Sequence, residues 1–340
     1  MALRKYGIVE EASYANCAAT EPDWYQDVSK LSASLNSEPI LKTTGSRMQK
    51  KARAGTVKPT ASTETDVDLQ RFAYYMKAFY DRYNYTDDTT GPSEKHIHEF
   101  FGGENSKLPS FKGWATFDYV QKVLAGLVLD EMKLEVNDEF MSCAGEWIYK
   151  NQKIVDLNPD EFEEIELAGN DIPLMSYDIS LELDGDVPPG IIKSLNFEGK
   201  NNHNVDNTIG LGSRFPQRKA AAQKREITLS FVSTMEKETL DLIKLAEHGD
   251  DTDTPSDCKV YRIPLKIIFE VCEDPTNKME MYFPDCLFAV EYEASESEEI
   301  EVTFNLTAMG TGKVERLDGS EVITDMYATL YNDMPEIVAK

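Results

Sequence analysis

One order of segments occurs twice in this 340-residue chain, and it constrains the fold more than any other feature of the sequence. Each half contains a strand-like segment, a basic loop, a second strand-like segment, a helical segment and, later, an acidic hairpin. In the strand-like segments apolar and polar residues alternate, as over 226–231, which is typical of strands with one buried face. Because a repeat of about half the chain length indicates an internal duplication, we predict a mainly β (α+β) fold with two similar halves.

The two halves match best at their basic loops. The tripeptide Gly-Ser-Arg at 45–47 recurs at 212–214, and similar segments surround both copies. In the first half we expect strands at 31–41 and 56–64, a helix at 66–80 and a hairpin at 127–150. In the second half we expect strands at 191–198 and 226–231, a helix at 236–246 and a hairpin at 287–309.

The remaining segments complete the predicted organisation. Helical spacing of apolar residues over 117–127 predicts a third helix, and the turn-forming residues of 84–113 predict a long loop. The acidic stretch 156–171 has few strand or helix signals. We therefore place the boundary there and predict two domains, 1–165 and 166–340.

Composition limits the possible functions. Lys and Arg number 35 against 61 Asp and Glu, a formal net charge of -26, which excludes a general nucleic-acid binder because such proteins neutralise phosphates with Lys and Arg. Apolar residues make up 41% of the chain, enough for a folded core. The sequence has no run of about 20 apolar residues and no secretory signal pattern. Five scattered cysteines without a C-x-x-C predict reduced thiols in an intracellular protein.

Charges of each sign are concentrated in the repeated segments. The basic residues gather in the two Gly-Ser-Arg loops, and six glutamates with no basic residue lie within 291–301. Such segregation favours head-to-tail self-association, in which patches of opposite charge steer subunits together.

The order of strand, Gly-Ser-Arg loop, strand, helix and acidic hairpin resembles the tail tube proteins of long-tailed bacteriophages. The resemblance is strongest over 210–231, GLGSRFPQRKAAAQKREITLSF, and looser over 38–64. It implies tandem β-sandwich or partial-barrel domains, each with a flanking helix and a long loop. Neighbouring domains of this family complete an inner β-barrel, and the rings stack into a tube. Two tube domains in one chain imply a trimeric ring with pseudo-sixfold symmetry rather than a hexamer.

The resemblance also implies partners and a location. The chain would act in the virion tail after assembly in the host cytoplasm, with itself, a tape measure protein and tail terminator or baseplate proteins as partners. Double-stranded DNA would pass through the tube without specific binding, and no membrane insertion is expected. Because carboxylates repel DNA, we expect the lumen-facing set to include Glu131, Glu135, Asp138, Glu139, Glu291, Glu293 and Glu301. Contacts between rings or subunits are expected from Arg47, Lys50, Lys51, Arg53, Arg214, Arg218, Lys219 and Arg225.

Other functions fit parts of the same sequence. A two-domain β-sandwich module of a phage baseplate or adhesion device, or a carbohydrate binder, is compatible with the same composition. His96 and His98 could place two metal ligands on one strand, but no third ligand is evident, so surface histidines are the simpler expectation. The Asp-rich segment 250–253 lacks a calcium-loop pattern, and the glycines near 210 lack a phosphate-binding one. We expect no catalytic residues, no metal and no cofactor.

Overall fold

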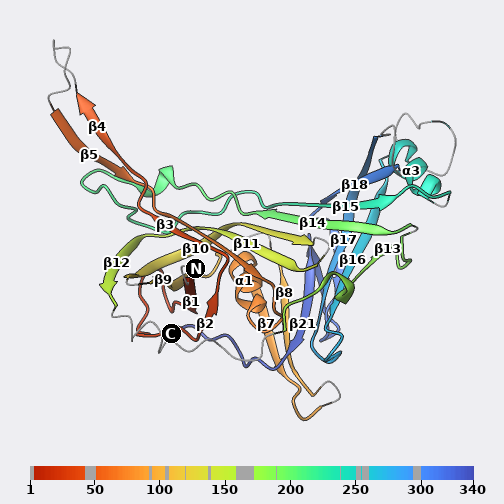
Figure 1. The fold of residues 1–340 in the computed structure, drawn as a ribbon, viewed down its shortest axis with the longest axis horizontal. Coiled ribbons are helices and arrows are strands. Elements are labelled where there is room, and N and C mark those ends of the chain that lie inside the picture. Colours follow the sequence, from red (N-terminus) through yellow and green to blue (C-terminus); the bar gives the residue numbers. More distant parts are fainter. Residues whose placement is uncertain are drawn as a thin grey trace.

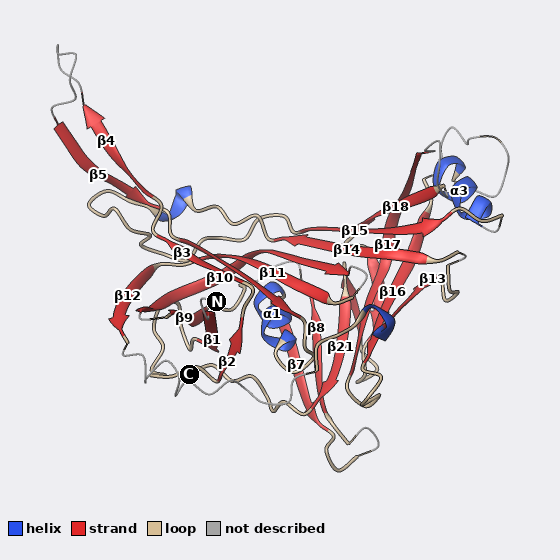
Figure 2. Cartoon of the chain, in the orientation of Figure 1, coloured by secondary structure: helices blue, strands red, loops and turns tan. Residues whose placement is uncertain are grey.

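The computed structural model describes residues 4–42, 51–91, 94–103, 107–118, 120–136, 139–157, 172–188, 190–237, 239–249, 254, 260–293 and 300–340. The fold is mainly β, as the sequence predicts. Figure 2 shows long strands through most of the molecule, with short helical segments among them.

The described strands are β1 (Arg4–Glu10), β2 (Trp24–Asp27), β3 (Lys30–Ser34), β4 (Ser37–Lys42), β5 (Lys51–Val57), β6 (Thr60–Asp66), β7 (Arg82–Asp87), β8 (His96–Phe101), β9 (Phe111–Phe117), β10 (Val120–Val136), β11 (Met141–Ile148), β12 (Asn151–Asp156), β13 (Ile179–Leu183), β14 (Ile192–Lys200), β15 (Glu226–Thr234), β16 (Arg262–Glu270), β17 (Lys278–Glu293), β18 (Glu301–Ala308), β19 (Gly312–Glu315), β20 (Glu321–Thr324) and β21 (Tyr327–Asn332). The described helices are α1 (Phe72–Phe79) and α3 (Thr239–His248), with short 3-10 turns at Ser176–Asp178 and Asp206–Thr208.

One antiparallel sheet runs through both halves of the chain. Its eight strands follow the order β3, β6, β11, β10, β14, β15, β18, β17. The first four strands come from the first half and the last four from the second. The halves join where β10 pairs with β14, from Glu131 opposite Lys200 to Val136 opposite Leu195. We call this pairing the seam; β10 and β14 lie side by side in Figure 1.

Two long strands each take part in two sheets. The first part of β10 pairs with β9 and β12, and the second part pairs with β11 and β14. Between the two parts lies Gly126, whose φ of 72° is in the left-handed region that glycine enters without a Cβ penalty. The β9–β10 register shifts at this glycine, as expected where a strand bends from one sheet into another. Strand β17 is divided in the same way: its first part pairs with β16 and β21, and its second part pairs with β18.

The two halves share one pattern of strand pairing. The order β3, β6, β11, β10 corresponds to β14, β15, β18, β17, and the β1–β9 pair corresponds to β13–β16. Helix α1 packs on β10 and helix α3 packs on β17. This pattern agrees with the repeated order of segments in the sequence. The predicted boundary near residue 165 lies outside the described residues, so the division into 1–165 and 166–340 stays a prediction.

A hydrophobic core extends beneath the seam and contains residues of both halves. Helix α1 is almost completely buried in it. At the end of α1 the ring of Phe79 packs edge-on against Phe197 of β14, with 6.3 Å between ring centroids. The first-half helix is thus covered by a strand of the second half. Both described helices begin later than predicted. Helix α1 begins at Phe72 rather than at residue 66, and α3 begins at Thr239 rather than at residue 236.

The sequence predictions for 117–127 and 84–113 are wrong. The helix predicted over 117–127 is the end of β9 and the start of β10. Because β10 is covered on both faces near its middle, Leu127, Val128 and Leu129 are all buried, and this run hides the alternation of a strand. The long loop predicted over 84–113 contains most of β7, all of β8 and the start of β9. Most of β8 is likewise buried, so it also lacks a period of two.

The close contact of α1 with β14 generates a stability prediction. A Cβ on Gly199 of β14 would overlap the buried ring of Phe79, which cannot move freely because Tyr80 and Phe197 pack against it. We expect Gly199→Ala to lower the free energy of unfolding by about 1–3 kcal/mol, measured by denaturant unfolding. Gly310→Ala is the matched control, because a Cβ there meets no atom within 4 Å. Equal stabilities of the two variants would contradict this packing.

Candidate functional site: an acidic sheet face with two open edges

The candidate site is the solvent-facing side of the eight-stranded sheet. On β10 the side chains of Met132 and Leu134 are 0% and 3% exposed and point into the core. Since successive side chains of a strand point to opposite faces, Glu131 and Glu135 lie on the outer face. The same alternation holds on β18, where Val302 is fully buried next to Glu301.

Acidic side chains outnumber basic ones on this face. Among the described side chains of the sheet, the outward-facing carboxylates are Glu64, Asp66, Glu131, Glu135, Glu146, Glu198, Glu226, Glu291 and Glu301. The outward-facing lysines are Lys30, Lys133, Lys193 and Lys200. Nine carboxylates against four lysines make the face negative, although part of the charge is neutralised locally.

The structure brings together some of the predicted acidic residues. Glu131, Glu135, Glu291 and Glu301 lie on this one face, although they come from hairpins far apart in sequence. Glu139 lies in the turn after β10 and is exposed. Asp138 and the side chain of Glu293 lie outside the described residues. Whether this face lines a channel stays a prediction.

Five outward carboxylates were missed by the sequence reasoning. They lie on strands β6, β11, β14 and β15 and are Glu64, Asp66, Glu146, Glu198 and Glu226. Alternation within STETD and EITLSF contains the signal for three of them, Glu64, Asp66 and Glu226, since every second residue there is apolar or small and buried. Their gathering with the hairpin glutamates depends on strand order, which alternation does not give.

A network of ion pairs crosses the seam on this face. The Nζ of Lys133 on β10 lies 2.7 Å from Glu131 Oε1 and 3.1 Å from Glu198 Oε1 on β14. Lys200 Nζ is 2.9 Å from the same oxygen of Glu198. The hydrogen bond from Lys200, followed by that from Lys133, lowers the pKa of Glu198 to about 2. The hydrogen bonds that Lys133 donates to Glu131 and Glu198 raise the pKa of Lys133. The seam therefore has complementary charges as well as backbone pairing.

The sheet ends at two unpaired strand edges. Within the described part of the chain, β3 pairs only with β6, and the 288–293 part of β17 pairs only with β18. The corresponding edge of the first half, the end of β10, is covered by β14. The end of β17 therefore has an unpaired edge where the corresponding end of β10 is paired with β14. Exposed edges of this kind are ready to pair with another strand.

The basic residues of the second half make contacts within the chain. Arg214 donates from Nε to Gly55 O at 3.1 Å and from a terminal nitrogen to Ser37 Oγ at 2.7 Å, and so fixes the 204–225 segment to the root of the β4–β5 hairpin. Arg218 donates to the backbone oxygen of Asn207.

The other two second-half residues are more buried. Lys219 donates to Leu108 O, and burial lowers its pKa to about 8. Arg225 forms a two-point ion pair with Asp325, at 2.7 and 2.8 Å. Each of these four basic side chains thus has a partner in its own chain, and a role between subunits stays a prediction.

The basic residues of the first half belong to a projecting arm. Figure 1 shows the β4–β5 hairpin extending away from the other strands. Lys51 opens β5 and Arg53 lies on it with an exposed side chain, so these two residues are on a strand where a loop was expected. Arg47 and Lys50 lie outside the described residues.

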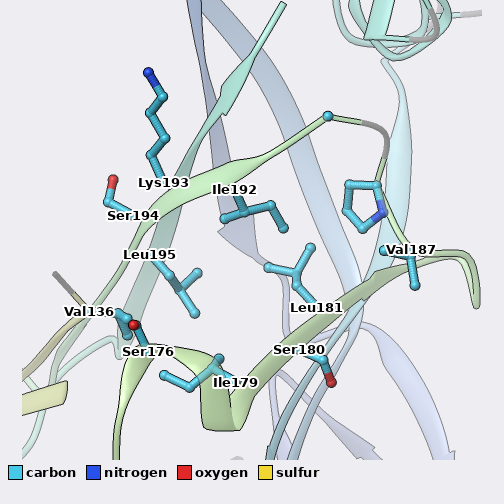
Figure 3. Close-up of a pocket in the computed structure, with 12 residues that line it drawn as sticks. Val136, Ser176, Ile179, Ser180, Leu181, Val187, Ile192, Lys193, Ser194 and Leu195 are labelled. Carbon is cyan, nitrogen blue, oxygen red and sulfur yellow. The ribbon is translucent and has the colours of Figure 1, made fainter. Parts of the chain in front are cut away.

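A cavity of about 280 Å³ lies between β13 and β14. Figure 3 shows Leu181 and Ile192 facing each other across it, with Leu195 below, while Lys193 points away. Lys193 instead binds Glu301, with 2.7 Å between Nζ and Oε1. Among the described residues, no carboxylate, histidine or cysteine lines the cavity, so the described lining offers packing rather than acid–base chemistry.

The histidine pair is not at the surface as expected. His98 on β8 is fully buried and bonds to Tyr83, whereas His96 is half-buried and bonds to Tyr85. Across the described segments, no group of three His, Cys, Asp or Glu side chains could hold a metal ion. The Asp-rich segment 250–253 is not described.

No protein-family profile matches the chain, and no curated protein sequence matches it. None of the helices in the described ranges is both long enough and apolar enough to cross a bilayer.

The charge network of the seam generates a pKa prediction. Lys200 contributes most to the low pKa of Glu198, so we expect Lys200→Met to raise that pKa more than Lys133→Met does, measured by NMR titration of the carboxyl carbon. Because the folded pKa of Glu198 is depressed, the network stabilises the fold above pH 4.5 and is lost as the pH falls towards 2.

Both lysine variants should flatten that pH dependence of unfolding. At pH 7 each should cost less than about 1 kcal/mol, since the pairs are partly exposed. Lys313→Met, which removes an exposed pair with Glu321, is the control and should leave Glu198 unchanged. A Glu198 pKa that does not respond to either seam lysine would contradict the network.

Proposed function

We propose that this chain is a structural subunit that associates head to tail into a closed ring, and that such rings stack into a bacteriophage tail tube that conducts double-stranded DNA. The observation that carries the proposal is the seam together with the two open edges. Strand β14 covers the end of β10 inside the chain. The corresponding strands, β3 and the end of β17, each have a described partner strand on one edge only.

The repeated pairing pattern supplies a rule for the contact between copies. Strand β3 corresponds to β14 and β17 corresponds to β10, so β3 of one copy would pair with β17 of the next as β14 pairs with β10. The two edges lie on different strands at opposite ends of the sheet, which makes the contact heterologous; such a contact closes into a ring when its rotation allows. Closure would remove both exposed edges.

Three copies fit the proposed symmetry. Two similar halves per chain would give such a ring six similar units. Neighbouring strands lie about 4.8 Å apart and tilt by about 40° in a barrel, so three eight-stranded sheets would enclose a circle of radius about 24 Å. Since barrels of 16–18 strands already leave an aqueous channel, this ring would leave a wider one.

The charge of the sheet face supports a conduit for DNA. With the core-facing side of the sheet covered by α1, α3 and the other strands, the acidic face would turn towards the lumen. A duplex carries one negative charge per about 1.7 Å of its axis, so carboxylates would repel it and let it slide. The tape measure, terminator and baseplate proteins of a tail would be the further partners, and the virion tail, assembled in the host cytoplasm, the location.

The test is the symmetry of assembled particles, with a charge exchange at the proposed edges. In electron micrographs of the purified protein at high concentration we expect rings or tubes with threefold symmetry. Lys30 on β3 and Glu291 on β17 both lie on the outer face, on the two strands that the seam rule would pair between copies, so their opposite charges would favour that contact. Lys30→Glu should therefore abolish or strongly reduce ring formation, and adding Glu291→Lys should restore it.

Controls separate assembly from folding. Lys30→Glu should change the free energy of unfolding by no more than about 0.5 kcal/mol, as is usual at exposed sites. Lys313→Glu, an exposed change on β19 away from both edges, should assemble normally. Rings of Lys30→Glu that match the original protein would show that the edges do not pair, and a monomer at all concentrations would favour a baseplate, adhesion or carbohydrate-binding module.

A further inference from the structure

The last eight residues form a strap that joins the two halves. Residues 333–340 leave β21 and cross α1 to reach β1, where Lys340 N donates to Glu10 O and Lys340 O accepts from Ala12 N, at 3.0 and 3.1 Å. Midway, Ile337 is 2% exposed, and its carbonyl oxygen accepts a hydrogen bond of 2.6 Å from Lys77 Nζ of α1.

The start of the strap is held by a buried histidine on β8. His98 Nε2 lies 3.0 Å from Asn332 Oδ1 and 3.0 Å from Met334 O. On the other side of the ring, Nδ1 lies 2.9 Å from the hydroxyl of Tyr83. The same hydroxyl accepts a hydrogen bond from Ile337 N at 3.3 Å. One imidazole thus contacts the strap directly at its start and, through Tyr83, at its middle.

These contacts require one neutral tautomer of His98. The amide of Asn332 is oriented by its own partners, since Nδ2 donates to Leu69 O at 2.8 Å and Oδ1 accepts from Met334 N at 3.1 Å. Both atoms facing Nε2 are therefore acceptors, and Nε2 carries the proton. Nδ1 is left as an acceptor for the hydroxyl proton of Tyr83. All described polar contacts of the ring are satisfied in this form.

A second proton on His98 would break this arrangement. This proton would bind to Nδ1 and point at the hydroxyl oxygen of Tyr83. The hydroxyl proton of Tyr83 would then lose Nδ1 as its acceptor. The buried charge would also face the ammonium of Lys77, which lies 4.2 Å from the centre of the Tyr83 ring. An unpaired polar group and an uncompensated charge in a buried site are both costly.

The other ionisable groups around the ring do not remove that cost. His96 lies on the same strand and lowers the pKa of His98 further, as Lys77 does. Tyr85 of β7 packs against the ring as a neutral phenol, with 5.5 Å between centroids. Glu10 of β1 is paired with Lys77 at 2.7 Å. Burial raises the pKa of the Tyr83 and Tyr85 hydroxyls, and the charge of Glu336 in the strap raises it further.

We propose that the 333–340 strap is an acid-released latch between the two halves and that protonation of His98 is its trigger. Opening would detach Ile337 and Lys340 from α1 and β1 while the sheets stay paired. The inference is independent of ring formation and concerns a single copy of the chain.

The pH window follows from the sign of the shift. Burial lowers the pKa of His98 from its ordinary 6.5 to about 4. The closed latch therefore disfavours protonation of His98. The closed state is most stable above pH 6.5 and loses stability as the pH falls from 6.5 to 4. Between pH 7.5 and pH 5 the closed-to-open ratio should fall by about 30-fold, and by more at pH 4.

Hydrogen–deuterium exchange of the full chain tests the latch. After correction for intrinsic exchange rates, the protection of the Ile337 and Lys340 amides should fall by about 30-fold between pH 7.5 and pH 5, while amides in the seam keep theirs. In His98→Gln, whose amide can still donate and accept but does not titrate, the fall should shrink to less than about 3-fold. His96→Gln on the same strand is the matched control and should keep the full response.

Two results would overturn the proposal. One is an unchanged pH response of the strap in His98→Gln or its loss in His96→Gln. The other is measured on the unaltered protein by NMR titration of the His98 ring, and therefore does not depend on the folding of a variant: a pKa of 6.5 or higher would show that the closed latch does not disfavour the proton.

Discussion

The structure depends most on the antiparallel pairing of β10 with β14. This pairing turns two four-stranded sets into one sheet, and it places Phe197 of the second half over Phe79 of the first-half helix. Because α1 has its apolar side chains covered in this way, the core is continuous across the halves. The ion pairs of Lys133 and Lys200 with Glu198 add charge complementarity on the solvent side. Backbone pairing, packing and charge thus act at one place.

The same pairing explains why the chain has two open edges. A repeat joined through β10 and β14 uses one edge of each half and leaves the other edge of each half, β3 and the end of β17, without a partner among the described strands. Pairing these edges between copies would extend the internal rule, and the acidic outer face would then become one continuous surface. The strap fixed by His98 strengthens the join on the opposite side of the molecule, where β21 pairs with both β8 and β17.

Shared strands account for the places where sequence reasoning failed. A strand with two sheets or a core on each side loses its alternation, as at Leu127 to Leu129 of β10, and its apolar spacing then imitates a helix. Strand β7 pairs with β8, and β8 pairs with β21, whose residues lie more than 200 positions away. A local pattern contains no information on such a distant partner, so the segment resembled a loop. Where one face is exposed, as on β15 and β18, the alternation predicted the strands correctly.

The sequence by itself determined the mainly β class, the repeated order of segments and the strands whose polar residues face water, because these depend on local period and composition. It also placed Glu131, Glu135, Glu291 and Glu301 in hairpins, but not on a common face. Only the tertiary structure decided that they share one sheet, that the half-buried Arg225 pairs with Asp325, and that His98 lies inside the molecule. These outcomes depend on which strands become neighbours, and that choice is made by the packing of the whole core rather than by any segment of it.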